Sequence, residues 1–100
     1  MSNTFSNISP KAKIGKGVKI ESFVSIGDDV EIGDNCWIGS NVSIMDGARI
    51  GNNCKIFPGA VISAIPQDLK FGGEKSIVKI GDNTTVREFA TINRATNYSG

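Results

Sequence analysis

Isoleucine recurs along this chain at every sixth position. The series is unbroken through most of the chain, and the same phase returns near its end: Ile8, Ile14, Ile20, Ile26, Ile32, Ile38, Ile44, Ile50, Ile56 and Ile62, then Ile80, Val86 and Ile92. Four residues after each anchor stands a small or β-branched residue: Ala12, Val18, Val24, Val30, Cys36, Val42, Ala48, Cys54 and Ala60, then Thr84, Ala90 and Thr96. A period of six is neither helical nor the simple alternation of a strand. It predicts a short strand followed by a corner, repeated many times.

Three such hexads make a coil that closes a triangle, with the large anchors pointing inward. The corners need positive φ, which Gly supplies and Asn or Asp tolerates. The strings GDD, GDN, GSN and GNN fall where those corners are expected. The pattern therefore predicts an all-β fold, a parallel β-helix of hexapeptide repeats with about five triangular coils.

Stacking of every third hexad predicts three columns of anchors inside the coil. Successive coils lie roughly 4.8 Å apart, so each column is a continuous apolar ladder. We expect one column of Ile8, Ile26, Ile44, Ile62 and Ile80, a second of Ile14, Ile32 and Ile50, and a third of Ile20, Ile38 and Ile56.

The repeat lapses after Ser63 and resumes before Val78. The intervening sequence, SAIPQDLKFGGEKS, contains Pro66 and the pair Gly72-Gly73. Ile62 and Ile80 are three hexads apart, so the phase alone does not separate an irregular coil from an excursion that leaves the coil and returns. Proline and paired glycines interrupt strand pairing, which favours an external loop over about 66–75. Loops on a rigid scaffold often carry function.

Composition narrows the possibilities further. With 100 residues, 14 Ile, 7 Val and a single Leu, the chain predicts one β domain spanning residues 1–100. The net charge of +1 does not predict the basic surface that binds nucleic acid. No apolar stretch reaches the roughly 20 residues that span a bilayer. No capping helix follows the last hexad, so we expect an uncapped coil that is the N-terminal part of a longer protein.

Few residues carry obvious chemistry. The chain has no His, the commonest general base and metal ligand, and only two Cys. Cys36 and Cys54 are one coil apart, which makes a disulfide conceivable, but both occupy the small inward column and are better interpreted as small apolar fillers. We expect no metal site.

Several apolar residues fall on outward or other non-anchor positions. They are Phe23, Trp37, Met45, Phe57 and Val61. Scattered apolar residues are normal on a protein surface, but β-helical prisms also pack side by side about threefold axes. These residues can therefore be interpreted either as scattered surface residues or as part of a subunit interface.

The expected loop holds Asp68 and Lys70, separated by a single leucine. A carboxylate and an ammonium at this spacing can bind the hydroxyl and phosphate groups of a nucleotide sugar. They can equally be a solvated pair, since exposed ion pairs are common and weak.

Two longer stretches carry a family resemblance. QDLKFGGE at 67–74, followed by VKIGDNTTVREFATINRAT at 78–96, resembles the UDP-N-acetylglucosamine O-acyltransferases that open lipid A synthesis. The resemblance implies a left-handed coil, a homotrimer in the cytoplasm and no cofactor. It also implies transfer of a 3-hydroxyacyl chain from acyl carrier protein to the 3-hydroxyl of UDP-N-acetylglucosamine.

The resemblance also assigns residues. Gln67, Asp68, Leu69 and Lys70 match the substrate-contacting loop, with Asp68 expected to bind the glucosamine part and Lys70 an anionic or polar part. The family's catalytic histidine lies beyond the segment matching Gly100, so this chain offers no catalytic residue and is expected to be inactive alone. Where many members read IHRGT, this chain has Asn93 in place of the histidine. Another hexapeptide acyltransferase and a non-enzymatic β-helical scaffold stay open as alternatives.

Overall fold

The chain forms three parallel sheets wound around a common interior. A computed structural model describes residues 5–64, 77–93 and 97–98. The first sheet, sheet A, contains β1 (Asn7–Ile8), β4 (Ser25–Ile26), β7 (Ser43–Ile44), β10 (Val61–Ala64) and β13 (Thr91–Asn93). Sheet B contains β2 (Lys13–Ile14), β5 (Glu31–Ile32), β8 (Ala48–Ile50), β11 (Val78–Ile80) and β14 (Asn97–Tyr98). Sheet C contains β3 (Lys19–Ile20), β6 (Trp37–Ile38), β9 (Lys55–Ile56) and β12 (Thr85–Val86).

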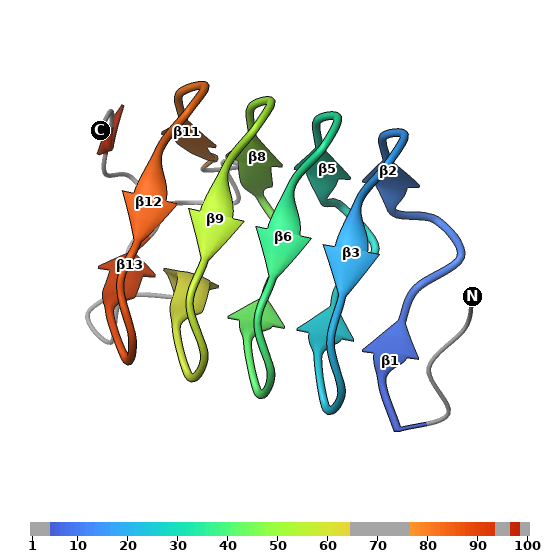
Figure 1. The fold of residues 1–100 in the computed structure, drawn as a ribbon. Helices are drawn as coiled ribbons and strands as arrows, with labels where there is room; N and C mark the ends of the chain where they lie inside the picture. Colours follow the sequence, from blue (N-terminus) through green and yellow to red (C-terminus); the bar gives the residue numbers. More distant parts are fainter. Residues whose placement is uncertain (1–4, 65–76, 94–96, 99–100) are drawn as a thin grey trace, which may run out of the picture.

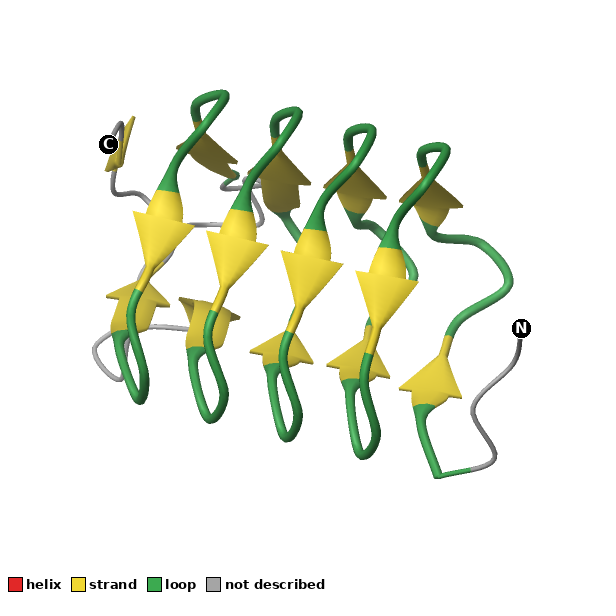
Figure 2. Ribbon diagram, viewed as in Figure 1, coloured by secondary structure: helices red, strands yellow, loops and turns green. Residues whose placement is uncertain are grey.

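Consecutive strands belong to different sheets, so the chain visits A, B and C in turn and pairs with itself one coil later (Figure 1). In Figure 1 it runs down the face that carries sheet C and up the opposite side while the coils advance from the N-terminus to the C-terminus. That path is a left-handed parallel β-helix. The described residues contain strands, turns and loops (Figure 2), and no helix among them could cross a membrane.

The anchors stack in register, which confirms the coil of three hexads. Ile8 pairs with Ile26, Ile26 with Ile44 and Ile44 with Ile62. One predicted column is wrong at its last member. Ile62 is followed by Ile92, and Ile80 instead pairs with Ile50 in sheet B.

The register explains the error. The pairs Ile50–Ile80, Ile56–Val86 and Ile62–Ile92 each span five hexads rather than three, so two extra hexads separate β10 from β11. A whole number of hexads preserves the sixfold phase while every later anchor moves to a different face. The residues expected as an external loop, 66–75, lie outside the described part of the chain.

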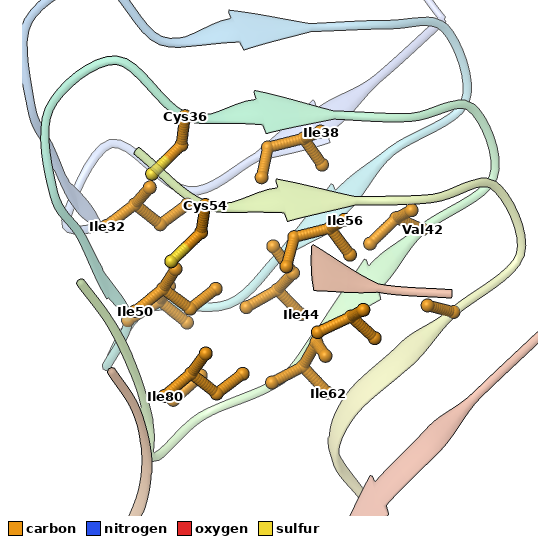
Figure 3. Close-up of a cluster of buried hydrophobic side chains, with 14 of the residues drawn as sticks. Ile32, Cys36, Ile38, Val42, Ile44, Ile50, Cys54, Ile56, Ile62 and Ile80 are labelled. Carbon is orange, nitrogen blue, oxygen red and sulfur yellow. The ribbon is translucent and has the colours of Figure 1, made fainter. Parts of the chain in front are cut away.

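The interior is aliphatic. Ile38, Ile56 and Ile62 are fully buried, and the small column between the anchors is closed by buried Val, Ala and Cys residues. Figure 3 shows Ile32, Ile50 and Ile80 one above another, with Ile38 and Ile56 in a second column. Burying one such side chain stabilises the fold by roughly 1.5–3 kcal/mol.

The corners confirm that glycine and asparagine supply left-handed φ. Three of the described corner residues with positive φ are glycines, and four are asparagines, among them Asn35, Asn41 and Asn53, with φ of 60°, 61° and 59°. The glycines that follow the anchors have a different role. Gly33 and Gly51, which follow the anchors, have no positive φ and are required because atoms of the next coil approach them closely.

Candidate functional site

The segment that carries the residues predicted to bind substrate follows a strand of sheet A in the chain. Gln67, Asp68, Leu69 and Lys70 lie outside the described residues, so the structure does not place their side chains. The chain leaves sheet A at Ala64, the last residue of β10, and is next described shortly before β11. The segment that carries these four residues therefore starts at the end of a sheet A strand.

The same strand end holds a second position singled out by the sequence. Asn93 is the last residue of β13, and its backbone pairs with Ala64 after an irregularity in the β10–β13 register. Asn93, the position at which the resemblance predicts a histidine, thus lies beside Ala64, after which the chain continues toward QDLK.

A shallow groove runs along the outer face of sheet A over neighbouring strands. It is lined by Asn7, Ser25, Ile26, Gly27, Ser43, Ile44, Met45 and Asp46. Sequence analysis missed this groove as a site. Its signal was the repetition of small neutral side chains at the same outward position of successive coils. The equivalent positions of sheets B and C mostly carry Lys, Glu, Arg or Trp.

One end of this groove carries the Asp46 carboxylate, and Asp28 lies at the same corner. The Ser9 hydroxyl donates to Asp28 Oδ1, and the Asp29 backbone N–H donates to Asp46 Oδ1 at 3.1 Å. These contacts fix the corner and leave the groove with hydroxyl, amide and carboxylate groups. Such groups recognise polar ligands by hydrogen bonding, but they supply neither a histidine base nor an accessible thiol nucleophile.

Sheet B presents charge on its outer face. Arg49 donates to the Asp29 carboxylate at 2.8 Å and to the backbone carbonyl of Asp29 at 3.0 Å, and its Nε lies 3.7 Å from Glu31. The guanidinium therefore ties adjacent coils together. This arrangement is structural, because the donors of Arg49 are already directed at groups of the protein.

Sheet C carries an aromatic cluster. The Trp37 indole N–H donates to Glu21 at 2.9 Å, and the Trp37 ring meets Phe57 edge-on with centroids 5.3 Å apart. The Arg87 guanidinium lies 4.4 Å from the centroid of the Phe57 ring. This cation–π contact stabilises the Phe57 ring, and the hydrogen bond to Glu21 orients Trp37.

The two cysteines are buried fillers, as predicted. Both are free thiols, and each lies within 3.1 Å of a backbone carbonyl of the next coil, Cys36 at Gly51 and Cys54 at Gly81. Burial raises the pKa of the Cys36 thiol, which keeps it protonated and unreactive at neutral pH. Among the residues that the structure describes, no cluster of three potential ligands could hold a metal ion.

Comparison with known proteins identifies the repeat. The sequence profile of the bacterial transferase hexapeptide (six repeats) family matches residues 11–36 and 29–64. The chain belongs to the bacterial transferase hexapeptide family. Its coils, its aliphatic columns and its turn asparagines are the structural form of that repeat.

Several hexapeptide relatives carry the name acyl-[acyl-carrier-protein]–UDP-N-acetylglucosamine O-acyltransferase. The chain is 63% identical to the protein from Sulfurihydrogenibium sp. over 91 residues, which cover 91% of this chain and 34% of the relative. It is 45% identical to the protein from Chlamydia caviae over 89 residues, 89% of this chain and 32% of the relative. The chain therefore spans about a third of the length of these relatives.

The coil also matches a solved structure closely. The crystal structure of a UDP-N-acetylglucosamine acyltransferase from Bacteroides fragilis superposes with a TM-score of 0.90 at 52% sequence identity, over 99% of this chain and 40% of that chain. The described coil thus has the same fold as the corresponding part of that structure.

Proposed function

We propose that this chain is the N-terminal third of an acyltransferase that acts on UDP-N-acetylglucosamine in the cytoplasm. The enzyme moves a 3-hydroxyacyl chain from acyl carrier protein to the sugar 3-hydroxyl, the first step of lipid A synthesis. The observation that carries the proposal is the 63% identity over nine-tenths of the chain to a relative of that name.

The reaction divides between this chain and the coils beyond it. The hydroxyl attacks the thioester carbonyl, an ester C–O bond forms and the C–S bond breaks. A base takes the hydroxyl proton and returns it to the departing thiolate, which leaves as the thiol of the carrier protein. This chain contains no histidine, so the base comes from a later coil, as it does in the family it resembles. Its own contribution is to bind the sugar nucleotide.

The proposed binding residues are Gln67, Asp68, Leu69 and Lys70. Asp68 would accept hydrogen bonds from the glucosamine hydroxyls, and Lys70 would pair with an anionic group of the nucleotide. Two observations support this location. The segment begins after Ala64, at the end of β10 in sheet A. Asn93, in the position of a family histidine, pairs with Ala64.

The fold also supports the expected homotrimer. A β-helical prism offers flat faces and straight corners along its length, and copies can pack about a threefold axis with their axes parallel. We propose that three copies assemble with the binding site at the contact between subunits.

A direct assay tests the function. The complete protein is incubated with UDP-N-acetylglucosamine and 3-hydroxyacyl-acyl carrier protein, and the products are separated by mass. We expect a nucleotide sugar esterified at the 3-hydroxyl. The present chain alone should give no product above a no-protein control. Failure of the folded complete protein to transfer the acyl group, with transfer from acetyl-coenzyme A to another sugar nucleotide instead, would contradict the proposal.

A further inference from the structure

Among the residues that the structure describes, no aromatic side chain lies in the core. Every buried apolar side chain in the described residues is aliphatic or Cys, whereas the described phenylalanines lie at the surface. Phe5, Phe23 and Phe89 are 66%, 57% and 79% exposed. Phe23 and Phe89 lie in the connections from sheet C to sheet A, which stack along one edge of the prism in Figure 1. Phe5 precedes β1 on the same edge. We call these three residues the aromatic ridge.

The ridge is costly to the isolated fold. Phe23 and Phe89 have φ of 63° and 59°, a left-handed conformation that bulky side chains rarely adopt. At the same corner, other coils use Asn41 and Gly59, which adopt this conformation readily. Neither the turn nor the core requires phenylalanine at these two positions.

The ridge is also held in place. The Phe5 and Phe23 rings are stacked with centroids 5.3 Å apart and an interplanar angle of 26°. Phe89 lies against the corner of the preceding coil, since a Cβ added to Gly59 would come within 2.5 Å of the Phe89 ring. Rigid, exposed aromatic side chains lose little conformational entropy on binding and are common at the centres of interfaces.

The ridge has an axial repeat that a partner must match. Phe5 and Phe23 are one coil apart, and Phe89 is three coils beyond Phe23 through Asn41 and Gly59. A surface that fits along this edge therefore needs the same repeat, roughly 4.8 Å per coil. The outer face of sheet A on a second copy has that repeat. Asn7, Ser25 and Ser43 stand in register on neighbouring strands and line its groove.

The shape of the prism sets the number of copies. Consider the triangular cross-section of the prism. A line from its centre to a corner and a line from its centre to the middle of an adjoining face differ in direction by one sixth of a full turn. This is also the angle between the directions to the two neighbours in a threefold ring, so a contact of corner on adjoining face closes with three copies and parallel axes. The ridge lies at a corner that adjoins sheet A.

We propose that the aromatic ridge of each subunit packs on the outer face of sheet A of the next, and that three such contacts close the trimer. This inference rests on the trimer in the proposed function and names the surfaces that form it. In a ring with threefold symmetry and parallel axes, each coil of one subunit lies opposite the same coil of the next. Phe5 and Phe23 therefore enter the groove at the level of Asn7 and Ser25 in the neighbour, and Phe89 meets the level of Val61 and Thr91.

The area is appropriate for part of a stable interface. Phenylalanine side chains bury roughly 150–250 Å² each, so the exposed fractions of the three rings amount to about 400 Å². A typical interface buries about 800 Å² per partner. The ridge thus supplies about half of one side, and the surrounding corner residues supply the rest. The net charge of +1 does not oppose contact between copies.

Substitution at the corner separates assembly from folding. In the complete protein, Phe23→Asn with Phe89→Asn installs the residue that other corners already use, so the circular dichroism spectrum should be unchanged. The trimer should dissociate at concentrations at least tenfold higher than wild type in sedimentation velocity. Asn35→Gly, at the corner between sheets B and C, is the matched control and should leave the trimer intact. A double variant that keeps the wild-type dissociation profile would overturn the proposal.

Photo-crosslinking locates the contact independently. With p-benzoylphenylalanine in place of Phe23, irradiation should give crosslinked subunits on a denaturing gel, joined to peptides containing Ser25 or Ser43. The same group in place of Asn35 should give none. A trimer that transfers acyl groups but crosslinks elsewhere would overturn the ridge while leaving the proposed function standing. A wild-type protein that neither assembles nor transfers acyl groups would overturn both.

Discussion

The side-chain oxygen of Asn52 occupies the space beside Gly33 that the Cβ of any other residue would need. From there it accepts a hydrogen bond from the Asp34 backbone N–H at 2.7 Å. The same relationship recurs one coil on, where Asp82 lies beside Gly51 and accepts from the Asn52 N–H at 2.8 Å. Gly33 and Gly51 therefore make room for a side-chain ladder that joins successive coils.

Two glycines that look alike in sequence should respond differently to alanine. At Gly33, a new Cβ would also lie 2.7 Å from the backbone of Gly51, whereas at Gly27 the nearest backbone atom, Asp46 N, is 3.3 Å away. Each Gly→Ala change should cost roughly 1–3 kcal/mol. Adding Asp46→Ala should relieve most of the loss at Gly27, while adding Asn52→Ala should not relieve Gly33. Urea unfolding of the four variants measures this, and equal rescue at both sites would contradict the close-approach explanation.

The anchor column should tolerate no charge. Ile38 is fully buried and stacks on Ile20 and Ile56. Ile38→Val should cost about 0.5–1.5 kcal/mol and Ile38→Ala about 2–5 kcal/mol, and Ile38→Asp should abolish folding because its carboxylate has no partner there. Lys55→Ala, on the exposed side of β9, should stay within about 0.5 kcal/mol of wild type. Cooperative thermal unfolding of Ile38→Asp would count against an interior column.

The left-handed corners should distinguish asparagine from alanine. Asn53 has a φ of 59° and donates its backbone N–H to the Asp34 carbonyl at 2.8 Å. Asn53→Gly should change the free energy of unfolding by no more than about 0.5 kcal/mol, whereas Asn53→Ala should lower it by about 1 kcal/mol. If both variants melt at the wild-type temperature, the corner does not depend on this conformation.

Alkaline pH should destabilise the fold through Cys36. Burial raises the pKa of this thiol above its ordinary value of 9.0, so between those two values the folded chain keeps a proton that the unfolded chain has lost. The stabilising contribution is complete below about pH 9 and falls as pH rises through this window. Cys36→Val introduces the residue that the neighbouring hexads carry at the same repeat position, Val30 and Val42. Its urea midpoint should fall less than that of wild type between pH 8 and pH 10, and parallel curves would exclude the thiol as the cause.

Much of this fold follows from a period of six. Spacing alone assigns Ile38, Val42 and Ile44 to the interior, and all three are buried. The prediction fails after β10, because a spacing of three hexads and a spacing of five hexads both leave the anchors at every sixth position. An excess of two hexads keeps every anchor on the sixfold series, so spacing makes Ile80 the partner of Ile62 although it pairs with Ile50.

Other features depend on contacts between coils, which spacing does not report. The role of Gly33 depends on where Asn52 points, and this is set by the next coil. The aromatic ridge depends on Phe23 and Phe89 sharing a corner, a relationship hidden by the same two extra hexads. The groove on sheet A is visible in the sequence only as small residues such as Ser25 and Ser43.

The binding site proposed for the segment after β10 is tested most directly by the kinetics of variants in that segment. In the complete protein, Asp68→Asn and Lys70→Ala should each raise the KM for UDP-N-acetylglucosamine by about 10- to 100-fold, the loss expected for one hydrogen bond to a charged group. Lys79→Ala, an exposed lysine on sheet B, is the control and should leave the KM unchanged. If both loop variants keep the wild-type KM, the sugar nucleotide does not bind at this edge of the coil.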